Sequence, residues 1–354
     1  MKNKKATELS GIKEIARRAR VSIATVDRVI HKRPGVSSKT RDKINRIIFE
    51  MNYQPNLLAR RLASRKIIRI ATLIPQVSAE TSFWEAPLSG IYQAELEIIR
   101  YGIKIEKYFF DQHDQKSFLK YARVILKSKP DGVLLAPSLI EESIQFTNSC
   151  KKLNIPFVFI NSDIPNQGSL CYIGPNLYQS GYLAADLVSY LINKNDKILI
   201  VNISKEMENH HHLLRKEEGF RAYFKNHKKT YRIVKIDIKG IDSPSIKKGI
   251  SGILAKHKDC KVIFVTNSRV SHVANYLEKS GKDILLIGYD FLKENINYLD
   301  KGVINFLICQ KPEKQAYLGI MALYKHLLLS KTVEEIYFMP IDIITKENYS
   351  FYGN

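Results

Sequence analysis

The sequence predicts a small all-α head that contains a helix-turn-helix, followed by a larger α/β body with parallel sheets. In the head, apolar residues recur at helical spacing in three short blocks between residues 12 and 51. From Ile67 onward, short β-rich runs such as IRIATLI, KILIVNI and ILLIG alternate with amphipathic stretches, which is typical of βαβ units. The length of 354 residues also favours more than one domain.

Positive charge is concentrated in the head. The whole chain has a formal net charge of +21. Residues 1–66 hold 18 Lys and Arg against 5 Asp and Glu (net +13), which leaves 38 against 30 (net +8) for the other 288 residues. Such a basic segment is attracted to a phosphate backbone through counterion release, whatever the base sequence. We therefore expect an anionic partner for the head.

The N-terminal segment MKNKKATELSG is basic but runs into no apolar stretch of the length of a secretory signal, and no window resembles a membrane span. These patterns predict a cytoplasmic protein. Cys150, Cys171, Cys260 and Cys309 are far apart among apolar residues and are expected to be reduced core thiols. The histidine run at 210–212 has no cysteine or acidic partner at a ligand spacing, so neither a metal nor a cofactor is predicted.

Three short helices are expected in the head, joined by two tight turns. Ser22 and Ser37 are good N-caps for the second and third helices, and the Pro34-Gly35 turn precedes the third. The residues expected to face the core are apolar and lie at helical spacing: Ile12, Ile15, Ala16, Ala19, Val26, Val29, Ile30, Ile44, Ile47, Ile48 and Met51. This arrangement is the plan of a helix-turn-helix.

The outward face of the second helix is a candidate surface for reading DNA bases. It carries Ala24, Asp27, Arg28 and His31 at i, i+3, i+4 and i+7. An arginine here can donate twice to guanine O6 and N7, and Ile23 with Ala24 can touch a thymine methyl. The candidate phosphate contacts are Ser22, Thr25, Ser37, Thr40 and Arg41. The alternative is that this face is merely solvated.

An ordered series of residues continues through the head and past it: Ile12, Val21-Ser22, Thr25-Val26, Arg28-Val29, Val36-Ser37, Thr40-Arg41, Asn52-Tyr53, Pro55-Asn56, Ala59-Arg60 and Leu62. This series resembles the LacI/GalR family of regulators. The resemblance implies that the second helix lies in the major groove, with Ile23, Ala24 and Arg28 at base-contacting positions and Ser22 at a phosphate. Tyr53, Asn56, Ala59 and Arg60 complete the implied DNA contacts.

The hinge, residues 56–66, is too short to form a stable helix by itself. We expect it to fold on DNA, where Leu62 matches the leucine that wedges into a central base step. The alternative is that Leu62 packs against the body.

Asp27 departs from the family, which usually has a small hydroxyl residue there. Its carboxylate can accept from cytosine N4 or orient Arg28, so the family's usual operator sequence is not expected.

The same resemblance implies the domain organisation. The head spans residues 10–55, the hinge 56–66, and an effector-binding and dimerisation domain 67–354. Two similar lobes are implied, the first at about 67–174 and 305–334 and the second at about 175–304 and 335–354. A ligand cleft is expected at the carboxyl ends of the strands. A homodimer would place two heads on a pseudo-palindromic operator, with ligand closure changing the hinge spacing.

Candidate effector contacts follow the predicted strands. Phe83-Trp84, with Gly90 six residues after the tryptophan, is similar to the paired aromatics that sandwich a sugar in periplasmic pentose-binding proteins. The strand-end residues are polar: Asn161, Asn267, Asp290 and Gln310. By resemblance the last three match effector-contacting positions, and Asn161 matches more loosely. The alternatives are a core tryptophan and residues that cap helices or order loops.

Sugar-binding relatives often carry an Arg five residues before the glycine of a Gly-Phe pair. Here Leu214 stands at that position before Gly219, so His211, His212 or Arg215 are the candidate substitutes. The alternative is that the ligand is not a common pentose or hexose.

The expected function is a transcriptional regulator whose operator affinity responds to a sugar or polyol. The alternative is a sugar-binding transport or chemosensory component with the same body. An enzyme is not expected, because no nucleophile elbow, Walker loop, dinucleotide glycine fingerprint or HExxH pair occurs.

Overall fold

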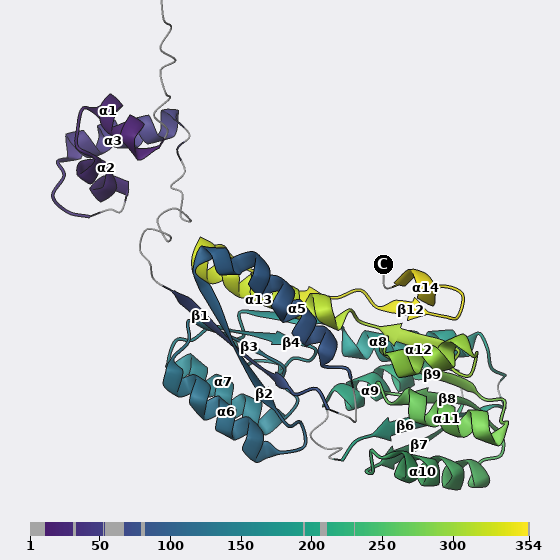
Figure 1. The fold of residues 1–354 in the computed structure, drawn as a ribbon. Helices are drawn as coiled ribbons and strands as arrows, with labels where there is room; N and C mark the ends of the chain where they lie inside the picture. The colour runs from purple at the N-terminus through teal and green to yellow at the C-terminus, as the bar shows by residue number, and fades with distance from the viewer. Residues whose placement is uncertain are drawn as a thin grey trace, which may run out of the picture. The chain divides into compact units, whose positions relative to one another are not determined.

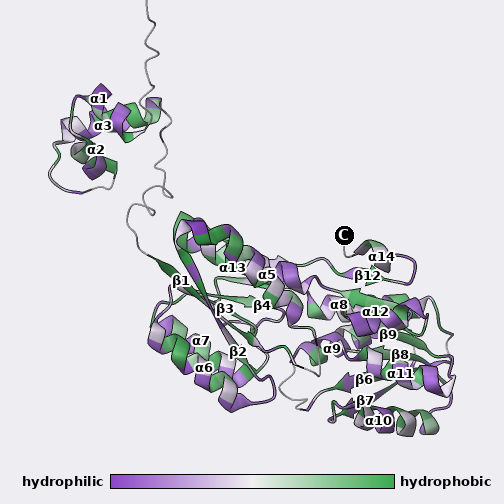
Figure 2. Cartoon of the chain, viewed as in Figure 1, coloured by the Kyte–Doolittle hydropathy of each residue, from purple (hydrophilic) through white to green (hydrophobic). Residues whose placement is uncertain are grey.

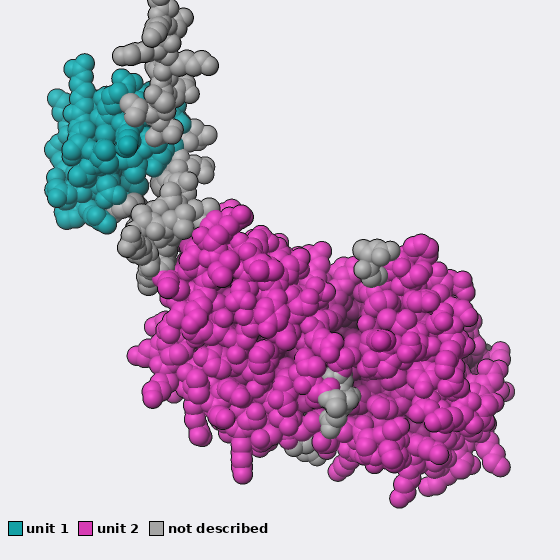
Figure 3. All heavy atoms as spheres, in the orientation of Figure 1, with its two compact units in different colours: residues 1–64 teal, residues 65–354 magenta. Residues whose placement is uncertain are grey.

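The computed structural model describes residues 11–30, 33–51, 53, 67–78, 82–193, 195–205, 211–229 and 231–352. The chain forms two compact units, residues 1–64 and 65–354, which are coloured separately in Figure 3. The division falls inside the predicted hinge.

The first unit contains the three expected helices, α1 (Ile12–Ala19), α2 (Ile23–Ile30) and α3 (Ser38–Glu50). Its core is formed by seven of the residues assigned to it from the sequence: Ile15, Ala16, Ala19, Val26, Val29, Ile44 and Ile47. Ser37 caps α3, since its hydroxyl accepts from the Thr40 N–H at 3.3 Å. The helical periodicity of the head is thereby confirmed.

The body contains two six-stranded sheets. The strands of the first sheet are β1 (Ile68–Pro75), β2 (Ile103–Phe110), β3 (Gly132–Leu135), β4 (Phe157–Ile160), β5 (Cys171–Gly174) and β11 (Ile336–Phe338). The strands of the second are β6 (Lys197–Ile203), β7 (Arg232–Ile238), β8 (Cys260–Val265), β9 (Leu285–Tyr289), β10 (Phe306–Cys309) and β12 (Asp342–Ile344). Their orders are β11-β5-β4-β3-β1-β2 and β12-β10-β9-β8-β6-β7. Among these strands only β12 pairs antiparallel, with β10.

Helices cover both faces of each sheet (Figure 1). The first sheet is covered on one face by α5 (Glu85–Ile98) and α13 (Pro312–Leu329), and on the other by α6 (Gln115–Ser128) and α7 (Ile140–Lys152). A short 3-10 turn, η1 (Ile99–Tyr101), follows α5. The helices of the second lobe are α8 (Leu177–Ser189), α9 (His211–Asn226), α10 (Ser243–Lys256), α11 (Val270–Ser280), α12 (Lys293–Asp300) and α14 (Tyr349–Tyr352).

Strand residues alternate between two apolar layers. Ile198 and Ile200 of β6 pack with α8 and α9, whereas Leu199 and Val201 pack with α10, α11 and α12. Burial on both faces explains why these strands read as continuous apolar runs, drawn mainly in green in Figure 2. The predicted fold class, a helical head and an α/β body with parallel sheets, is confirmed.

The lobe boundaries predicted near the C-terminus were wrong at two strands. β10 pairs with β9 and therefore belongs to the second sheet, while β11 pairs with β5 in the first. Within the described residues the chain passes between lobes after β5, after β10 and after β11. Strand periodicity shows that a segment is a strand but not which sheet edge it joins.

Glycines allow two helix pairs to touch through their backbones. A Cβ on Gly219 of α9 would lie 1.9 Å from the Tyr178 carbonyl oxygen, and a Cβ on Gly181 of α8 would lie 1.9 Å from that of Lys216. A Cβ on Gly90 of α5 would similarly lie 2.0 Å from the Glu313 carbonyl oxygen at the start of α13. These glycines therefore fix how closely the helices approach.

We predict that Gly219→Ala destabilises the body by at least about 2 kcal/mol, because α8 and α9 must separate to admit the methyl group. Gly252→Ala on the exposed surface of α10 is the matched control, since a Cβ there meets no atom within 4 Å. The control should leave stability unchanged or raise it by up to about 1 kcal/mol. Urea unfolding of the full chain measures both, and equal effects at the two glycines would contradict the packing argument.

Candidate functional site

The outward surface of α2 is exposed as predicted. Ser22, Ile23, Ala24 and Arg28 are exposed, while Thr25 and Asp27 are partly buried. The Ile23 side chain is 49% exposed although it is apolar. An isoleucine exposed to this extent leaves apolar surface available for contact with a partner.

Two hydroxyl pairs lie at the first turns of the head helices. Ser22 and Thr25 place their side-chain oxygens 2.9 Å apart at α2, and Ser37 and Thr40 do the same at α3. Helix N-termini offer free N–H groups and positive potential to phosphate. Arg41 adds an exposed cation on α3.

The remaining predicted DNA contacts differ in their surroundings. The Asp27 carboxylate lies 3.3 Å from the Arg33 guanidinium, so a neighbouring cation balances this departure from the family. Tyr53 packs against the head core, where burial raises the pKa of its hydroxyl. His31, Asn56, Ala59, Arg60 and Leu62 lie outside the described residues.

A pocket lies between the lobes of the body, at the carboxyl ends of the strands. Its described lining residues are Phe83, Trp84, Gln112, His113, Ser138, Asn161, Ile203, Ser204, His212, Leu213, Lys216, Asn267, Ser268, Arg269, Asp290 and Gln310. Seven of the eight predicted effector contacts are in this set. Arg215 is not, because its guanidinium contacts Glu218 and the Tyr178 ring at the surface. The cavity encloses about 70 Å³.

The aromatic pair forms one wall. The rings of Phe83 and Trp84 meet edge to face with centroids 5.0 Å apart. The Trp84 indole N–H donates to the Gln112 side-chain oxygen at 3.4 Å. Trp84 is both buried and part of the pocket lining, so its burial in the core does not exclude it from the pocket.

Asn267 holds its own loop. Its side-chain NH₂ donates to the Ile203 carbonyl at 2.7 Å, and its oxygen accepts from the Arg269 N–H at 3.3 Å. Asn161 has a left-handed φ of 69°, and its N–H donates to Gln315 at 3.0 Å. The loop-ordering alternative therefore applies to Asn267, although the residue also faces the pocket.

Asp290, Gln310 and Lys216 each bring a buried polar group to the pocket. Asp290 Oδ1 and Gln310 Nε2 are buried without a hydrogen-bond partner among the described residues. Lys216 Nζ lies 3.5 Å from the centroid of the Tyr289 ring and donates to the Thr266 carbonyl at 3.2 Å. Buried polar groups without partners are rare in folded proteins, and in a pocket they are ready to bind a ligand.

Burial shifts the pKa values of Asp290 and Lys216. Desolvation raises the pKa of Asp290 to about 6, against the opposing influence of the Lys216 ammonium. Desolvation also lowers the pKa of Lys216 to about 8, against the influence of Asp290. Each effect follows from the cost of a charge in a low-dielectric interior.

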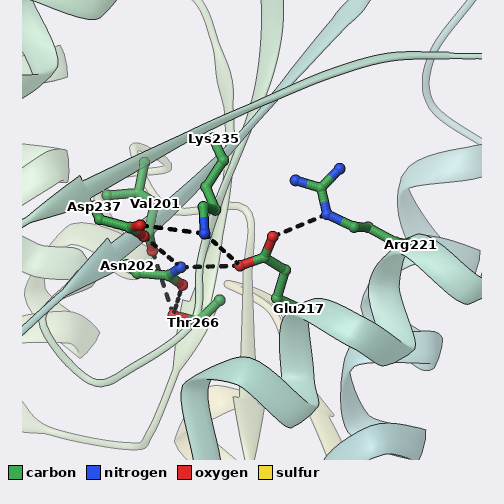
Figure 4. A network of polar contacts seen from close by, with 7 residues as sticks. All are labelled: Val201, Asn202, Glu217, Arg221, Lys235, Asp237 and Thr266. Carbon is green, nitrogen blue, oxygen red and sulfur yellow. Dashed lines mark hydrogen bonds and ion pairs between the residues drawn. The ribbon is translucent and has the colours of Figure 1, made fainter. Parts of the chain in front are cut away.

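A polar network behind the pocket holds α9 on the sheet (Figure 4). Thr266 donates to Asn202 at 2.6 Å, and Asn202 donates to Glu217 at 3.1 Å and to Asp237 at 2.9 Å. Arg221 donates to Glu217 from the opposite side at 2.9 Å. Since Glu217 follows Lys216, this network also fixes the pocket lysine.

Residues 70–331 match the periplasmic binding protein domain, and residues 11–56 match the bacterial regulatory proteins of the lacI family. A solved structure from Bacteroides fragilis, classed as a LacI transcriptional regulator, is 30% identical with a TM-score of 0.77, over 81% of this chain and 100% of that one. This chain belongs to the LacI family.

This LacI-family chain is also similar to a second regulator and to a sugar-binding protein. Catabolite control protein A of Staphylococcus xylosus is 29% identical over 157 residues, 44% of this chain and 45% of that protein, so the match spans about half of each. GanP, a glucose-galactose binding protein from Geobacillus stearothermophilus, is 23% identical with a TM-score of 0.71, over 80% and 99% of the two chains. The second similarity shows the fold of the body.

Lys216 of this LacI-family chain, a cation in the pocket lining, was not among the residues expected to replace the missing arginine. Leu214 is 41% exposed, whereas Lys216, three residues before Gly219, is buried in the pocket lining. Gln112, His113, Ser138 and Arg269 were also missed. For Lys216 the available signal was its i, i+3 spacing from Gly219, which places both residues on one helix face.

In the described part of the chain, no helix combines the length and apolar character needed to cross a bilayer. All four cysteines are free and buried, as expected.

We predict that the wild-type protein loses stability relative to Asp290→Asn as pH rises from about 4 to about 6. The pKa of Asp290 is raised in the fold, so ionising it costs free energy that is absent below its unfolded pKa and fully present above pH 6. The difference should be on the order of 3 kcal/mol. Thermal denaturation of the full chain across this range measures it.

Asp242→Asn is the control of opposite sign. Asp242 caps α10, and the Ser245 N–H lowers the pKa of its carboxylate. The wild-type advantage over this variant should therefore grow as pH rises. Parallel behaviour of the two variants would contradict the assignment of burial as the cause at Asp290.

Proposed function

We propose that this chain is a cytoplasmic transcriptional regulator whose affinity for operator DNA is controlled by a sugar or polyol bound between the lobes. The observation that carries the proposal is that one chain combines an exposed helix-turn-helix surface with a pocket in which Asp290 Oδ1 and Gln310 Nε2 are buried without a hydrogen-bond partner among the described residues. A sugar-binding transport or chemosensory component would use the pocket but leaves the head without a role.

The head supports sequence-specific DNA binding. Arg28 is exposed, and its guanidinium lies near Gly35 in the turn that leads to α3. From α2 it can reach guanine in the major groove, while the hydroxyl pairs hold phosphates on either side. Asp27 accepts from cytosine N4 or stays paired with Arg33. The hinge folds on DNA, where Leu62 enters the minor groove.

The pocket supports recognition of a polyhydroxylated molecule. A hydroxyl group can donate to Asp290 Oδ1 and accept from Gln310 Nε2, and both atoms are without partners among the described residues. Phe83 and Trp84 offer an aromatic wall to the C–H face of a sugar ring. The related fold of a glucose-galactose binding protein is consistent with this ligand class.

The size of the cavity supports a conformational switch. It encloses about 70 Å³, less than the roughly 150 Å³ of an engineered cavity that holds benzene. A sugar therefore enters only after the lobes or their side chains separate. Ligand binding is then coupled to the opening and closing of the lobes, and the hinges transmit this change to the DNA.

Exposed apolar residues on α5 and η1 support homodimerisation. Tyr92, Leu96 and Ile99 are 48%, 80% and 60% exposed. Their spacing places them along one stripe, which a second copy can cover by two-fold symmetry. A dimer presents two heads to the two halves of a pseudo-palindromic operator.

The deciding experiment is selection of bound duplexes from a random DNA pool by the purified full chain near physiological salt. A pseudo-palindrome with a flexible central step is expected. Salt-sensitive binding without any motif, with and without candidate sugars, would contradict the regulator proposal.

We predict that Arg28→Ala weakens binding to the selected operator by about 1–3 kcal/mol and relaxes the base preference at one position in each half-site. Lys13→Ala, at an exposed position of α1, removes the same charge and is the matched control. It should change affinity only slightly. Titration by fluorescence anisotropy measures both. Equal losses in the two variants would mean that Arg28 contributes only charge.

We predict that Leu96→Glu weakens self-association at least tenfold, because a carboxylate would be buried in the apolar stripe. Val124→Glu on α6, where Val124 is 44% exposed, is the control and should associate normally. Sedimentation velocity measures the association. A Leu96→Glu protein that dimerises like wild type would place the interface elsewhere.

A further inference from the structure

We infer that the edge of the second sheet, formed by β7 and the neighbouring helix α10, is a docking surface for an extended, acidic segment of another protein. The inference goes beyond the regulator function and does not depend on the effector. β7 is the last strand of its sheet, and α10 packs beside it (Figure 1). Among the described strands β7 pairs only with β6, so its outer row of backbone N–H and C=O groups is open to an added strand.

The net positive charge of the body is concentrated at this edge. Residues 225–261 hold 11 Lys and Arg against 3 Asp and Glu (net +8), which leaves 27 against 27 for the rest of residues 67–354. The three acidic side chains of the segment are already engaged: Asp237 with Lys235 at 3.2 Å, Asp259 with Lys197 at 2.8 Å, and Asp242 with the Ser245 N–H at 2.9 Å. The surface therefore attracts an acidic partner and repels the same edge of a second copy.

A groove of about 480 Å³ lies between β7 and α10. Its apolar lining comes from Ile236, Ile238 and Ile253, and Lys248 and Lys256 of α10 line it as well. Both lysines are exposed, and within the described part of the chain neither forms an ion pair. About 12 Å of helix axis separates them, which is the span of about four residues of an extended strand.

The lysines of α10 are not explained by protection of the sheet edge. Lysines on an edge strand itself, such as Lys235 of β7, hinder its pairing with another copy. Lys248 and Lys256 lie outside the strand and line the groove beside it. They are therefore placed to pair with acidic side chains of a segment that occupies the groove.

The chemistry of the groove favours a polypeptide over a nucleic acid. An added strand satisfies the open backbone groups of β7, as extended peptides do at other sheet edges. Its successive side chains alternate between two faces, so apolar residues can contact the isoleucines while acidic neighbours approach the lysines. Nucleic acid bases stack on aromatic rings, and none of the described lining residues is aromatic.

The experiment measures binding of labelled peptides to the full chain by fluorescence anisotropy near physiological salt. The probe is a peptide of about nine residues in which Glu and Val alternate. Three peptides of the same length are compared with it: one with the same residues in two blocks, one in which Lys replaces Glu, and one with a methyl group on every backbone nitrogen. We expect the probe to bind at least about tenfold more tightly than each of them, because only the probe combines charge, alternation and free backbone groups.

A double charge reversal tests the lysines. Lys248→Glu with Lys256→Glu should weaken binding of the probe at least about tenfold. Lys43→Glu with Arg46→Glu, at exposed positions of α3 in the basic head, changes the charge by the same amount and is the matched control. The control should leave affinity nearly unchanged, and a loss in the control alone would place the peptide on the head and overturn the inference.

A steric variant tests the groove without changing its charge. A Cβ on Gly252 of α10 meets no atom within 4 Å, so Gly252→Leu fills open space in the groove and favours the helix. It should weaken binding of the probe at least about tenfold while thermal denaturation shows a folded protein. Ala255→Leu, exposed on α10 but not in the groove lining, is the control and should bind the probe normally.

Three other results would overturn the inference. Binding by none of the peptides would leave the surface without the inferred partner, and equal binding of the block or N-methylated peptide would mean attraction by charge alone. A single-stranded oligonucleotide that displaces the probe, and whose binding is weakened by Lys248→Glu with Lys256→Glu, would assign the surface to nucleic acid instead.

Discussion

The contact between α8 and α9 is the constraint on which the pocket depends. Gly181 and Gly219 let the two helix backbones meet, and the carbonyl that rests on Gly181 belongs to Lys216. The Asn202–Glu217 network secures the other side of α9 against the sheet. The backbone of the pocket lysine can therefore move only if the two helices separate or the network breaks, and the Tyr289 ring and the Thr266 carbonyl hold its ammonium in the pocket.

The pocket holds charges that burial disfavours. The pKa of Lys216 falls and that of Asp290 rises, because neither group is fully compensated by its surroundings. Asp290 also has a left-handed φ of 74°, a conformation that costs free energy for a residue with a side chain. The site therefore lowers the free energy of unfolding of the body. A ligand that pairs with these groups raises it again.

The sequence predicted the residues whose positions follow from strand direction. Asn161, Asp290 and Gln310 reach the pocket because parallel strands end at the same edge of a sheet. Lys216 was not predicted, because the contact between α9 and α8 determines which face of α9 points into the pocket. The sheets joined by β10 and β11 were misassigned because pairing partners are a tertiary property. The hydrogen bonds of Asn267 to its own loop likewise could not be predicted from the residue type alone.

Gln310 lines the pocket and also belongs to a segment that connects the two lobes. It lies directly after β10, where the chain passes to α13, and the next residue, Lys311, has a left-handed φ of 50°. A ligand that engages Gln310 therefore acts on a connecting segment itself and not on a distant surface. A displacement of a fraction of an ångström so near the pivot becomes a much larger swing at the far ends of the lobes.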